Sequence, residues 1–511
     1  MISFFIRRLA ISVFVLLGAS FIIYMLIAYS GDPLEDLRGS NDPNKDNLIR
    51  NRINNLNLDV HPAARYFLWL GGASKCLIGQ CDLGKSLDQQ PVTEALKHAI
   101  PSTLQLVSAA SVIAIIIGIT IGVITALRQY STFDYAVTFV SFLFFSLPVF
   151  WVAVLLKEFA AIRFNDFLAE ATFSTQAIIT IAVVSGLVWV IAIGGDWRRR
   201  AITFVSGAAA TGAVFAYFSA TKWFQTPRLG VVVIAVTGAA IAYGATSMFA
   251  GKGDRRALYA SLTTAGVGVV LYFFMPEVFN NSSFSLWWLV GLLAVALAVA
   301  AVIGFAYGGW DRAQSIKASM VAAFGVSFLI VLDRFMQAWP AYNSSRLIRG
   351  RPIPTIGANT PGLRGSFWLH GVDRFTHLLL PTLALLLISL AGYTRYSRAS
   401  MLEVLGQDYV RTARAKGLPE RLVIFRHAFR NALLPLATVV AFDLGGLIGG
   451  AVITEYIFSI KGMGQLFIVG VYRTDPNPVM AVAVISGITA IVANLVADMM
   501  YSVLDPRVRV Q

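Results

Sequence analysis

The sequence is short of charge and of cysteine. Only 13% of its 511 residues are Asp, Glu, Lys or Arg, and cysteine occurs twice. Soluble domains carry about a quarter charged residues, so this composition excludes an ordinary soluble domain. The chain also lacks a strand-to-helix phosphate loop ending in Gly-Lys-Ser/Thr and a His-Glu-x-x-His pair, which argues against an ATP hydrolase and a zinc peptidase. We therefore expect no catalytic residue, no metal site and no cofactor bound by this chain.

The sequence is instead rich in long apolar runs. Hydrophobic residues make up 57% of the chain, the mean hydropathy is +0.69, and apolar runs of about 20 residues recur, as membrane-spanning helices require. The net charge of +14 would suggest a nucleic-acid partner in a soluble protein. Here Lys and Arg are concentrated in short loops, which is the positive-inside bias of membrane proteins. The composition predicts an all-α polytopic membrane protein that binds no nucleic acid.

The first apolar run, residues 9–29, follows Arg7-Arg8 and is too long for the core of a cleaved signal peptide. We expect a retained span with a cytoplasmic N-terminus, followed by a polar extracytoplasmic segment over residues 30–100. Five further spans of this frame are expected at 102–127, 134–156, 376–394, 434–456 and 479–501.

A repeated pattern separates the third and fourth of these spans. Asp196, Asp254 and Asp311 occupy similar turns rich in glycine and basic residues, and an apolar run lies on each side of every turn. The pattern predicts three tandem helical hairpins with cytoplasmic turns. The hairpins are expected over about 176–219, 229–275 and 286–334. Together with the frame they give about twelve spans, with both termini in the cytoplasm.

Cys76 and Cys81 lie in the extracytoplasmic segment. In an oxidising compartment they are candidates for a local disulfide, and the alternative is a pair of free thiols. Two cysteines without a nearby third ligand do not complete a tetrahedral metal shell.

Residues 395–433 form a loop with many more basic than acidic side chains, which places the loop in the cytoplasm. Small residues alternate with cations around Ala413-Arg414-Ala415 on a short expected helix. Gly417 allows a reversal of the chain, and Pro419-Glu420 suits the first turn of a second helix. Such a helix can enter a groove on another protein while its arginines pair with acids at the rim. The alternative is an ordinary cytoplasmic loop that contacts lipid headgroups.

The same loop resembles a known coupling motif. Residues 408–418 read Asp-Tyr-Val-Arg-Thr-Ala-Arg-Ala-Lys-Gly-Leu, and residues 426–435 read Arg-His-Ala-Phe-Arg-Asn-Ala-Leu-Leu-Pro. Both segments resemble the membrane subunits of dipeptide and oligopeptide ABC importers. Gly-Asp-Pro at 31–33, Ser-Leu-Pro-Val-Phe-Trp at 146–151 and Leu-Asp-Pro-Arg at 504–507 also resemble this family.

The resemblance covers about residues 1–156 and 346–511, in order. It implies a six-span type I importer permease core into which the three hairpins are inserted, and it offers no function for the hairpins. The implied domains are 1–159 for the first half of the core, 160–345 for the insertion and 346–511 for the second half. The implied partners are a homologous second permease subunit, two ATP-binding subunits that hold ATP and Mg, and an extracytoplasmic substrate-binding protein. The implied place is the lipid bilayer of a bacterial cytoplasmic membrane.

Coupling to the ATPase is expected to involve Tyr409, Arg411, Thr412, Ala413, Arg414, Ala415, Lys416 and Gly417. In this hypothesis Arg411 and Arg414 pair with acidic groups of the ATPase, Ala413 and Ala415 enter its groove, and Gly417 forms the turn. A bulky residue in place of Gly417 is expected to uncouple transport without preventing membrane insertion.

Three acidic positions lie near span ends and one lies deeper. Asp443 falls within an expected span, where a carboxylate costs roughly 2.5–3.5 kcal/mol on insertion scales. We expect it to contact the substrate or to brace a subunit interface. Glu455, Asp333 and Asp498 are expected at the membrane interface, where solvation is easier.

Two other functions are also compatible with a polytopic membrane protein of this kind. An ion-gradient-driven secondary transporter would show two similar halves, whereas this chain has a threefold repeat inside a six-span frame. A non-transporting membrane scaffold would not need a coupling loop. The sequence does not identify the solute, since related permeases carry dipeptides, oligopeptides, nickel chelates and other small solutes.

Overall fold

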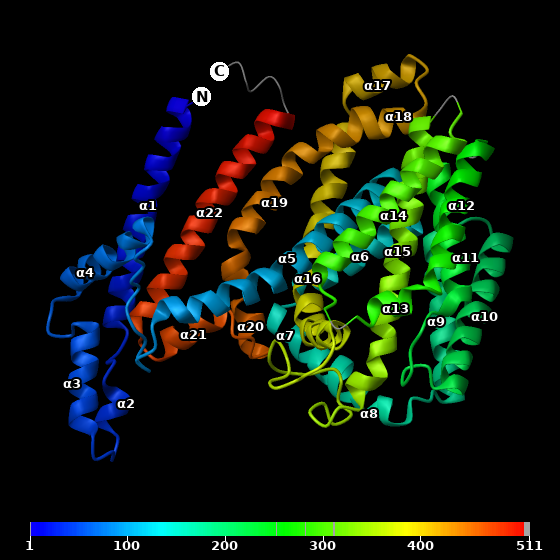
Figure 1. Ribbon diagram of the computed structural model, residues 1–511. Helices are drawn as coiled ribbons and strands as arrows, with labels where there is room; N and C mark the ends of the chain where they lie inside the picture. Colours follow the sequence, from blue (N-terminus) through cyan, green and yellow to red (C-terminus); the bar gives the residue numbers. More distant parts are fainter. Residues whose placement is uncertain (1, 252, 282, 310–311, 505–511) are drawn as a thin grey trace.

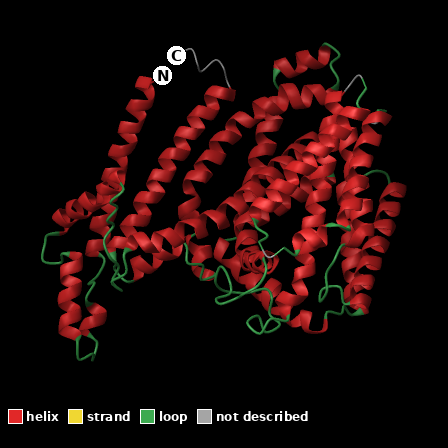
Figure 2. Cartoon of the chain, in the orientation of Figure 1, coloured by secondary structure: helices red, strands yellow, loops and turns green. Residues whose placement is uncertain are grey.

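The computed structural model describes residues 2–251, 253–281, 283–309 and 312–504 (Figure 1). Every regular element in these residues is a helix, and Figure 2 shows only helices joined by loops. Nine of the described helices are long and apolar enough to cross a membrane, or ten if one bent helix pair counts as a span. The prediction of an all-α polytopic membrane protein is confirmed, while the number of twelve spans stays a prediction.

Two long helices, α5 (Val92–Leu127) and α16 (Phe367–Leu405), form the central pair of the fold. Glycines allow their backbones to approach closely. A Cβ atom added at Gly122 would lie 2.6 Å from the carbonyl oxygen of Thr394, and one at Gly118 would lie 2.7 Å from the Cβ of Tyr393. The pair therefore has no room for side chains at these two positions.

Further helices flank this pair. Helix α1 (Ile2–Tyr29) packs on α22 (Pro476–Leu504), and α22 packs on α19 (Arg430–Gly450). The hydroxyl of Ser400 donates a hydrogen bond to the carbonyl of Ala432 at 2.8 Å, which joins α16 to the first turn of α19. In Figure 1 the start of α1 and the end of α22 lie at the same end of the molecule as α17 (Asp408–Ala415).

The segment between the first two spans folds into the short helices α2 (Glu35–Arg38), α3 (Lys45–Leu56) and α4 (Pro62–Ser74) and the 3-10 turn Lys75–Ile78. It lies at the end of the molecule opposite α17 (Figure 1). Two hydrogen bonds join the segment to the start of α22. The N–H of Leu87 donates to Asp475 Oδ2 at 2.7 Å just before this helix, and Asn477 Nδ2 in its first turn donates to the carbonyl of Lys85 at 2.8 Å.

The expected span over 134–156 is not a single helix, and its crossing of the membrane stays a prediction. The chain forms α6 (Thr132–Ser146) and then turns by 101° into α7 (Val149–Leu155), a π-helical stretch Leu156–Ile162 and α8 (Arg163–Glu170). Proline has no N–H to donate and disfavours helical geometry in the residue before it. Leu147 accordingly adopts an extended conformation before Pro148.

Each of the three expected hairpins corresponds to two consecutive helices that pack together. They are α9 (Thr175–Ile193) with α10 (Trp197–Thr221), α11 (Gly230–Phe249) with α12 (Arg255–Tyr272), and α14 (Leu286–Tyr307) with α15 (Arg312–Asn343). Helix α12 is not among the nine span candidates, and its first turn carries two arginines. Of the three aspartates named for the hairpin turns, Asp311 lies outside the described part.

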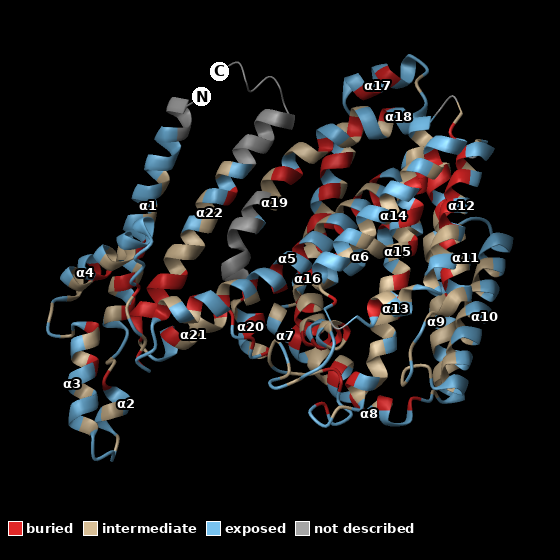
Figure 3. Ribbon diagram, in the orientation of Figure 1, coloured by how far each residue is buried: buried red, intermediate tan, exposed pale blue. Residues whose placement is uncertain are grey.

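The second and third hairpins form a bundle in which α15 contacts α11, α12 and α14, and the short helix α13 (Met275–Phe279) joins the two hairpins. The first hairpin packs beside α6. Figure 3 shows exposed residues along both α9 and α10. Arg128, just after α5, donates to the carbonyl of Ala192 at 2.9 Å, and Arg421 donates to the carbonyl of Met248. These contacts place the ends of α9 and α11 on the side of the molecule that carries α17.

Candidate coupling loop and translocation cavity

The expected loop over 395–433 begins within a helix. Helix α16 runs on to Leu405, and α17 (Asp408–Ala415), α18 (Glu420–Leu422) and a π-helical stretch Val423–Phe429 follow it. In Figure 1 α17 and α18 project from one end of the molecule. The loop is therefore built of two short helices joined by a turn, as the sequence predicts.

Helix α17 has an inner and an outer face. Val410 and Ala413 are buried against a cluster that includes Met401 and Val423. The opposite face exposes four residues at helical spacing: Asp408, Arg411, Thr412 and Ala415. The expectation that Ala413 enters a partner groove is wrong, because this side chain packs within its own chain. Ala415 remains on the exposed face.

The two arginines of α17 differ in their surroundings. Arg414 Nη2 lies 2.8 Å from Glu420 Oε1 and joins α17 to α18. This guanidinium holds the pKa of Glu420 below its usual value. Arg411 lies only within 3.8 Å of Asp408, and its side chain is 71% exposed. Of the two, Arg411 is therefore the one that is presented outward.

The remaining positions of the predicted coupling site are also on this surface. Asn431 Nδ2 donates to the hydroxyl of Tyr409 at 2.9 Å, and the hydroxyl of Thr412 donates to the carbonyl of Asp408 at 2.8 Å. Lys416 is exposed. Gly417 has φ +73°, and an added Cβ would meet no atom within 4 Å. The turn thus depends on the backbone freedom of glycine and not on space for a side chain.

An ion pair between Asp134 and Arg398, here called the clamp, joins α6 to α16 near the start of the expected loop and was not predicted from the sequence. Arg398 of α16 binds Asp134 of α6 with two hydrogen bonds, from Nε at 2.7 Å and from Nη2 at 2.9 Å. Asp134 also accepts the N–H of Tyr130 at 3.0 Å. One turn earlier, the guanidinium of Arg395 lies 4.3 Å from the ring of Phe145. Two cations that were counted as loop charges therefore hold α6 against α16.

A cavity of about 580 Å³ lies between α5, the α6–α7 bend, α16 and α19. Its polar lining comprises Ser111, Ser389, Tyr393, Tyr396 and Asp443. The side chain of Asp443 is exposed and lines this cavity together with Tyr393. The sequence reading singled out Asp443 alone. The polar residues of α16 recur every three or four positions within an apolar span, and this spacing was the available signal.

Two other acids are satisfied by protein groups. Glu455 is fully buried and accepts the hydroxyl of Thr103 at 2.6 Å and the N–H of Gln465 at 3.1 Å. Asp333 is fully buried and accepts the N–H of Leu229 at the start of α11 and the hydroxyl of Tyr272. Protein groups rather than interfacial water therefore satisfy both carboxylates, while their placement at the membrane interface stays a prediction. The side chain of Asp498 lies outside the described residues.

Cys76 and Cys81 are joined in a disulfide that closes the turn after α4. Among the described residues no group of three His, Cys, Asp or Glu side chains is placed to hold a metal ion.

The fold defines a polytopic helical membrane protein, and sequence comparison places it in a family. A model of the binding-protein-dependent transport system inner membrane component matches residues 319–510, which include the candidate coupling loop. The oligopeptide transport system permease protein OppB of Mycobacterium tuberculosis is 38% identical over 231 residues, covering 43% of this chain and 69% of OppB. The chain belongs to this family of inner membrane transport components.

Two further relatives match shorter stretches. The oligopeptide transport system permease protein AppB of Bacillus subtilis is 45% identical over 156 residues, covering 30% of this chain and 48% of AppB. The dipeptide transport system permease protein DppB of Escherichia coli is 45% identical over 138 residues, covering 27% of this chain and 41% of DppB. As a family member, the chain is a multi-pass permease component of an ABC transport complex and is not itself an ATPase.

Proposed function

We propose that this chain carries peptides into the cytoplasm as one of two permease subunits of an ABC importer. The relatives named above are permeases of oligopeptide and dipeptide systems. The observation that carries the proposal is the exposed face of α17, a short helix whose inner face is buried on its own chain. A face of this kind suits docking into a groove of a partner ATPase.

The docking movement reaches the spans through the buried side of the loop. Val410 and Ala413 of α17 pack with Met401 of α16 and with Ala432 of α19. A force on the outer face of α17 therefore acts on two spans that line the cavity. ATP shifts the equilibrium between inward- and outward-facing states only if the ATPases bind one state more tightly.

The orientation follows from the same hypothesis. The end that carries α17 faces the cytoplasm with both termini, and helices α2–α4 face the binding protein outside. The homologous second permease subunit completes the pathway, and two partner subunits bind ATP and Mg. The division at 159/160 and 345/346 makes the six-span core from the two ends of the chain, with the three hairpins beside it.

Within the cavity, Asp443 is the candidate for binding the ammonium group of a peptide. A carboxylate forms a charge-assisted hydrogen bond to an ammonium group, and Tyr393 lines the same cavity as Asp443. For Asp443→Asn we expect about tenfold slower uptake of a dipeptide with a free amino terminus, as the loss of such a bond implies. Uptake of the same dipeptide with an acetylated amino terminus serves as the control. An equal change for both dipeptides would contradict this role.

Docking is tested in proteoliposomes that contain this chain, its second permease subunit, the ATPases and a peptide-loaded binding protein. Arg411→Glu places a like charge opposite an acidic partner, which costs several kcal/mol at an interface. We expect it to abolish ATPase binding and peptide-stimulated hydrolysis, whereas Arg411→Lys keeps the charge and retains most of both. If the chain binds no ATPase and its uptake follows an ion gradient, the importer proposal is wrong.

A further inference from the structure

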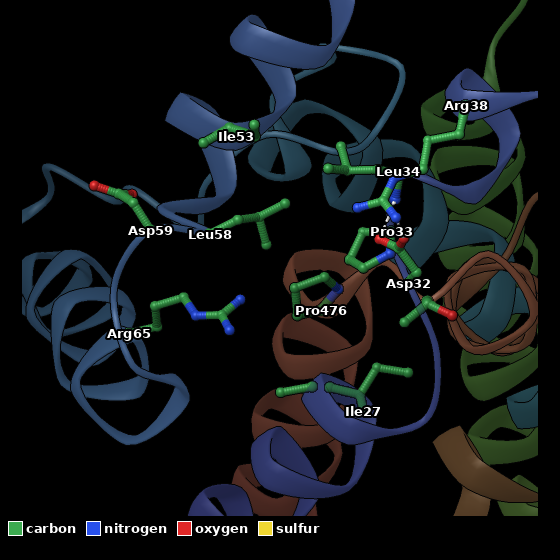
Figure 4. Close-up of a pocket in the computed structure, with 12 residues that line it drawn as sticks. Ile27, Asp32, Pro33, Leu34, Arg38, Ile53, Leu58, Asp59, Arg65 and Pro476 are labelled. Atoms are coloured by element: carbon green, nitrogen blue, oxygen red, sulfur yellow. Dashed lines mark hydrogen bonds and ion pairs between the residues drawn. The ribbon is translucent and has the colours of Figure 1, made fainter. Parts of the chain in front are cut away.

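A second cavity, of about 440 Å³, lies at the end of the molecule opposite α17. It is bounded by the end of α1, the short helices α2–α4 and the start of α22 (Figure 4). Much of its wall is apolar and is formed by Ile27, Leu34, Ile53, Leu58 and Pro476. This site shares no lining residue with the translocation cavity.

Two arginines, Arg38 and Arg65, line this cavity together with the apolar residues, and they differ in whether a protein group pairs with them. Arg38 lies 3.1 Å from Asp32 and is neutralised by it. Arg65 Nε is buried and has no hydrogen-bond partner among the described residues. Figure 4 shows the guanidinium of Arg65 directed toward the space beside Leu58 and Pro476, while Asp59 points away from it. A buried donor without a partner is costly. The Arg65 side chain as a whole is only half-buried, so the rest of its guanidinium can reach a ligand, and the cavity suits an anionic group attached to an apolar body.

The depth of α4 in the membrane indicates what kind of molecule supplies the apolar part of the ligand. The ring of Tyr66 on α4 lies 5.2 Å from Phe21 and 5.8 Å from Tyr24 of α1. Phe21 precedes the last residue of α1, Tyr29, by about 12 Å along the helix at ~1.5 Å per residue. Helices that lie in the membrane interface are buried about 5–10 Å into it. Because α1 is a membrane span, α4 lies near this depth in the leaflet that faces away from α17.

The outward surface of α4 and of the disulfide turn is apolar, as a lipid environment requires. Phe67 and Leu68 are 64% and 56% exposed on α4, and Leu77 and Ile78 are 92% and 73% exposed in the turn. Water would be an unfavourable neighbour for these four side chains, whereas acyl chains would cover them.

We propose that this cavity binds a phospholipid of the leaflet facing away from α17. Arg65 donates hydrogen bonds to the phosphate, since a guanidinium matches phosphate oxygens well. The acyl chains run along Phe67 and Leu68. The guanidinium lies beside the end of α1 and the start of α22, which is the level of the headgroups. The site anchors the extracytoplasmic helices to the membrane.

The test uses the purified full chain in detergent with added phosphatidylglycerol, and native mass spectrometry measures the lipid that is retained. Arg65→Gln is expected to weaken lipid binding by about tenfold or more, because a hydrogen bond to a charged group is lost. Arg346→Gln removes an exposed arginine from a loop elsewhere in the chain and is expected to change nothing. Arg65→Lys keeps the charge and is expected to retain part of the binding.

Two results would overturn the proposal. Equal retention of phosphatidylglycerol by wild type and Arg65→Gln would mean that the lipid is held elsewhere. Stabilisation of the wild type by inorganic phosphate, without retention of lipid, would assign the cavity to free phosphate. A photoreactive residue at position 67 supplies a readout that does not depend on Arg65. We expect it to cross-link to acyl-labelled phospholipid in vesicles, and cross-linking to the binding protein alone would also overturn the proposal.

Discussion

Asp134→Ala is expected to lower the free energy of unfolding by about 3 kcal/mol and to reduce peptide-stimulated ATP hydrolysis. The carboxylate is buried and receives two hydrogen bonds from Arg398. Breaking a buried ion pair by removing one partner costs about 3–5 kcal/mol, because the other charge is left without compensation. The Arg398 side chain is 28% exposed, so we expect the lower end of this range. Unfolding of the purified chain in detergent measures the change.

The expected functional effect has a structural reason. Asp134 lies in the first turn of α6, and α6 leads to Phe145 and Val149 at the wall of the translocation cavity. Arg398 lies on α16, about two turns before that helix ends at Leu405 and the chain continues into α17. Loss of the pair therefore lets α16 move without α6, so that a movement of α17 is transmitted to fewer of the helices around the cavity.

A double-mutant cycle measures the interaction energy between Asp134 and Arg398 separately from the other contacts of each residue. Arg398→Met alone strands the carboxylate and Asp134→Asn alone strands the guanidinium, while the double variant Asp134→Asn with Arg398→Met removes both charges and is expected to recover much of the lost stability. The exposed pair formed by Glu94 and Lys97 supplies the matched control, and Glu94→Gln is expected to have little effect. Equal losses for Asp134→Ala and Glu94→Gln would contradict a clamp.

The pairing of Asp134 with Arg398 could not be predicted from the sequence, whereas other features could. The two short helices of the candidate coupling loop were predictable because their signals are local: a glycine at the turn and a proline that opens the next helix. The three hairpins were predictable because their turns repeat. Asp134 and Arg398 are 264 residues apart, and neither residue carries a local mark of its partner. Such a pairing becomes visible only when the helices are assembled.

Two other features could not be predicted from the sequence: which face of a short helix is buried, and which groups satisfy a buried carboxylate. Eight residues of α17 form barely two turns, and both Ala413 and Ala415 looked suited to a partner groove. The structure buries Ala413 and exposes Ala415, because Val410 sets the inner face. Glu455 was expected to depend on interfacial water, whereas Thr103 and Gln465 satisfy it within the protein. The donors that decide such cases lie on other helices.

Gly417→Val is expected to abolish most transport while the protein still inserts into the membrane. The backbone at Gly417 has φ +73°, a left-handed conformation that costs roughly 1–2 kcal/mol for residues with a Cβ and is worst for branched side chains. This conformation closes α17, because the N–H of Leu418 donates to the carbonyl of Ala413 at 3.4 Å. In the variant we expect the turn to open and Arg414 to separate from Glu420. Uptake and ATPase assays in proteoliposomes measure the loss.

The control for this prediction comes from the open space around the turn. Since an added Cβ at Gly417 meets no atom within 4 Å, the Cβ itself has room, and the defect is expected from the backbone conformation. Asn tolerates the left-handed conformation better than other residues with a Cβ, so Gly417→Asn is expected to keep most of the transport. About 1.4 kcal/mol corresponds to a tenfold change in a population, so the cost in Gly417→Val is enough to depopulate the docking conformation. Equal transport by the valine and asparagine variants would show that coupling does not depend on this turn.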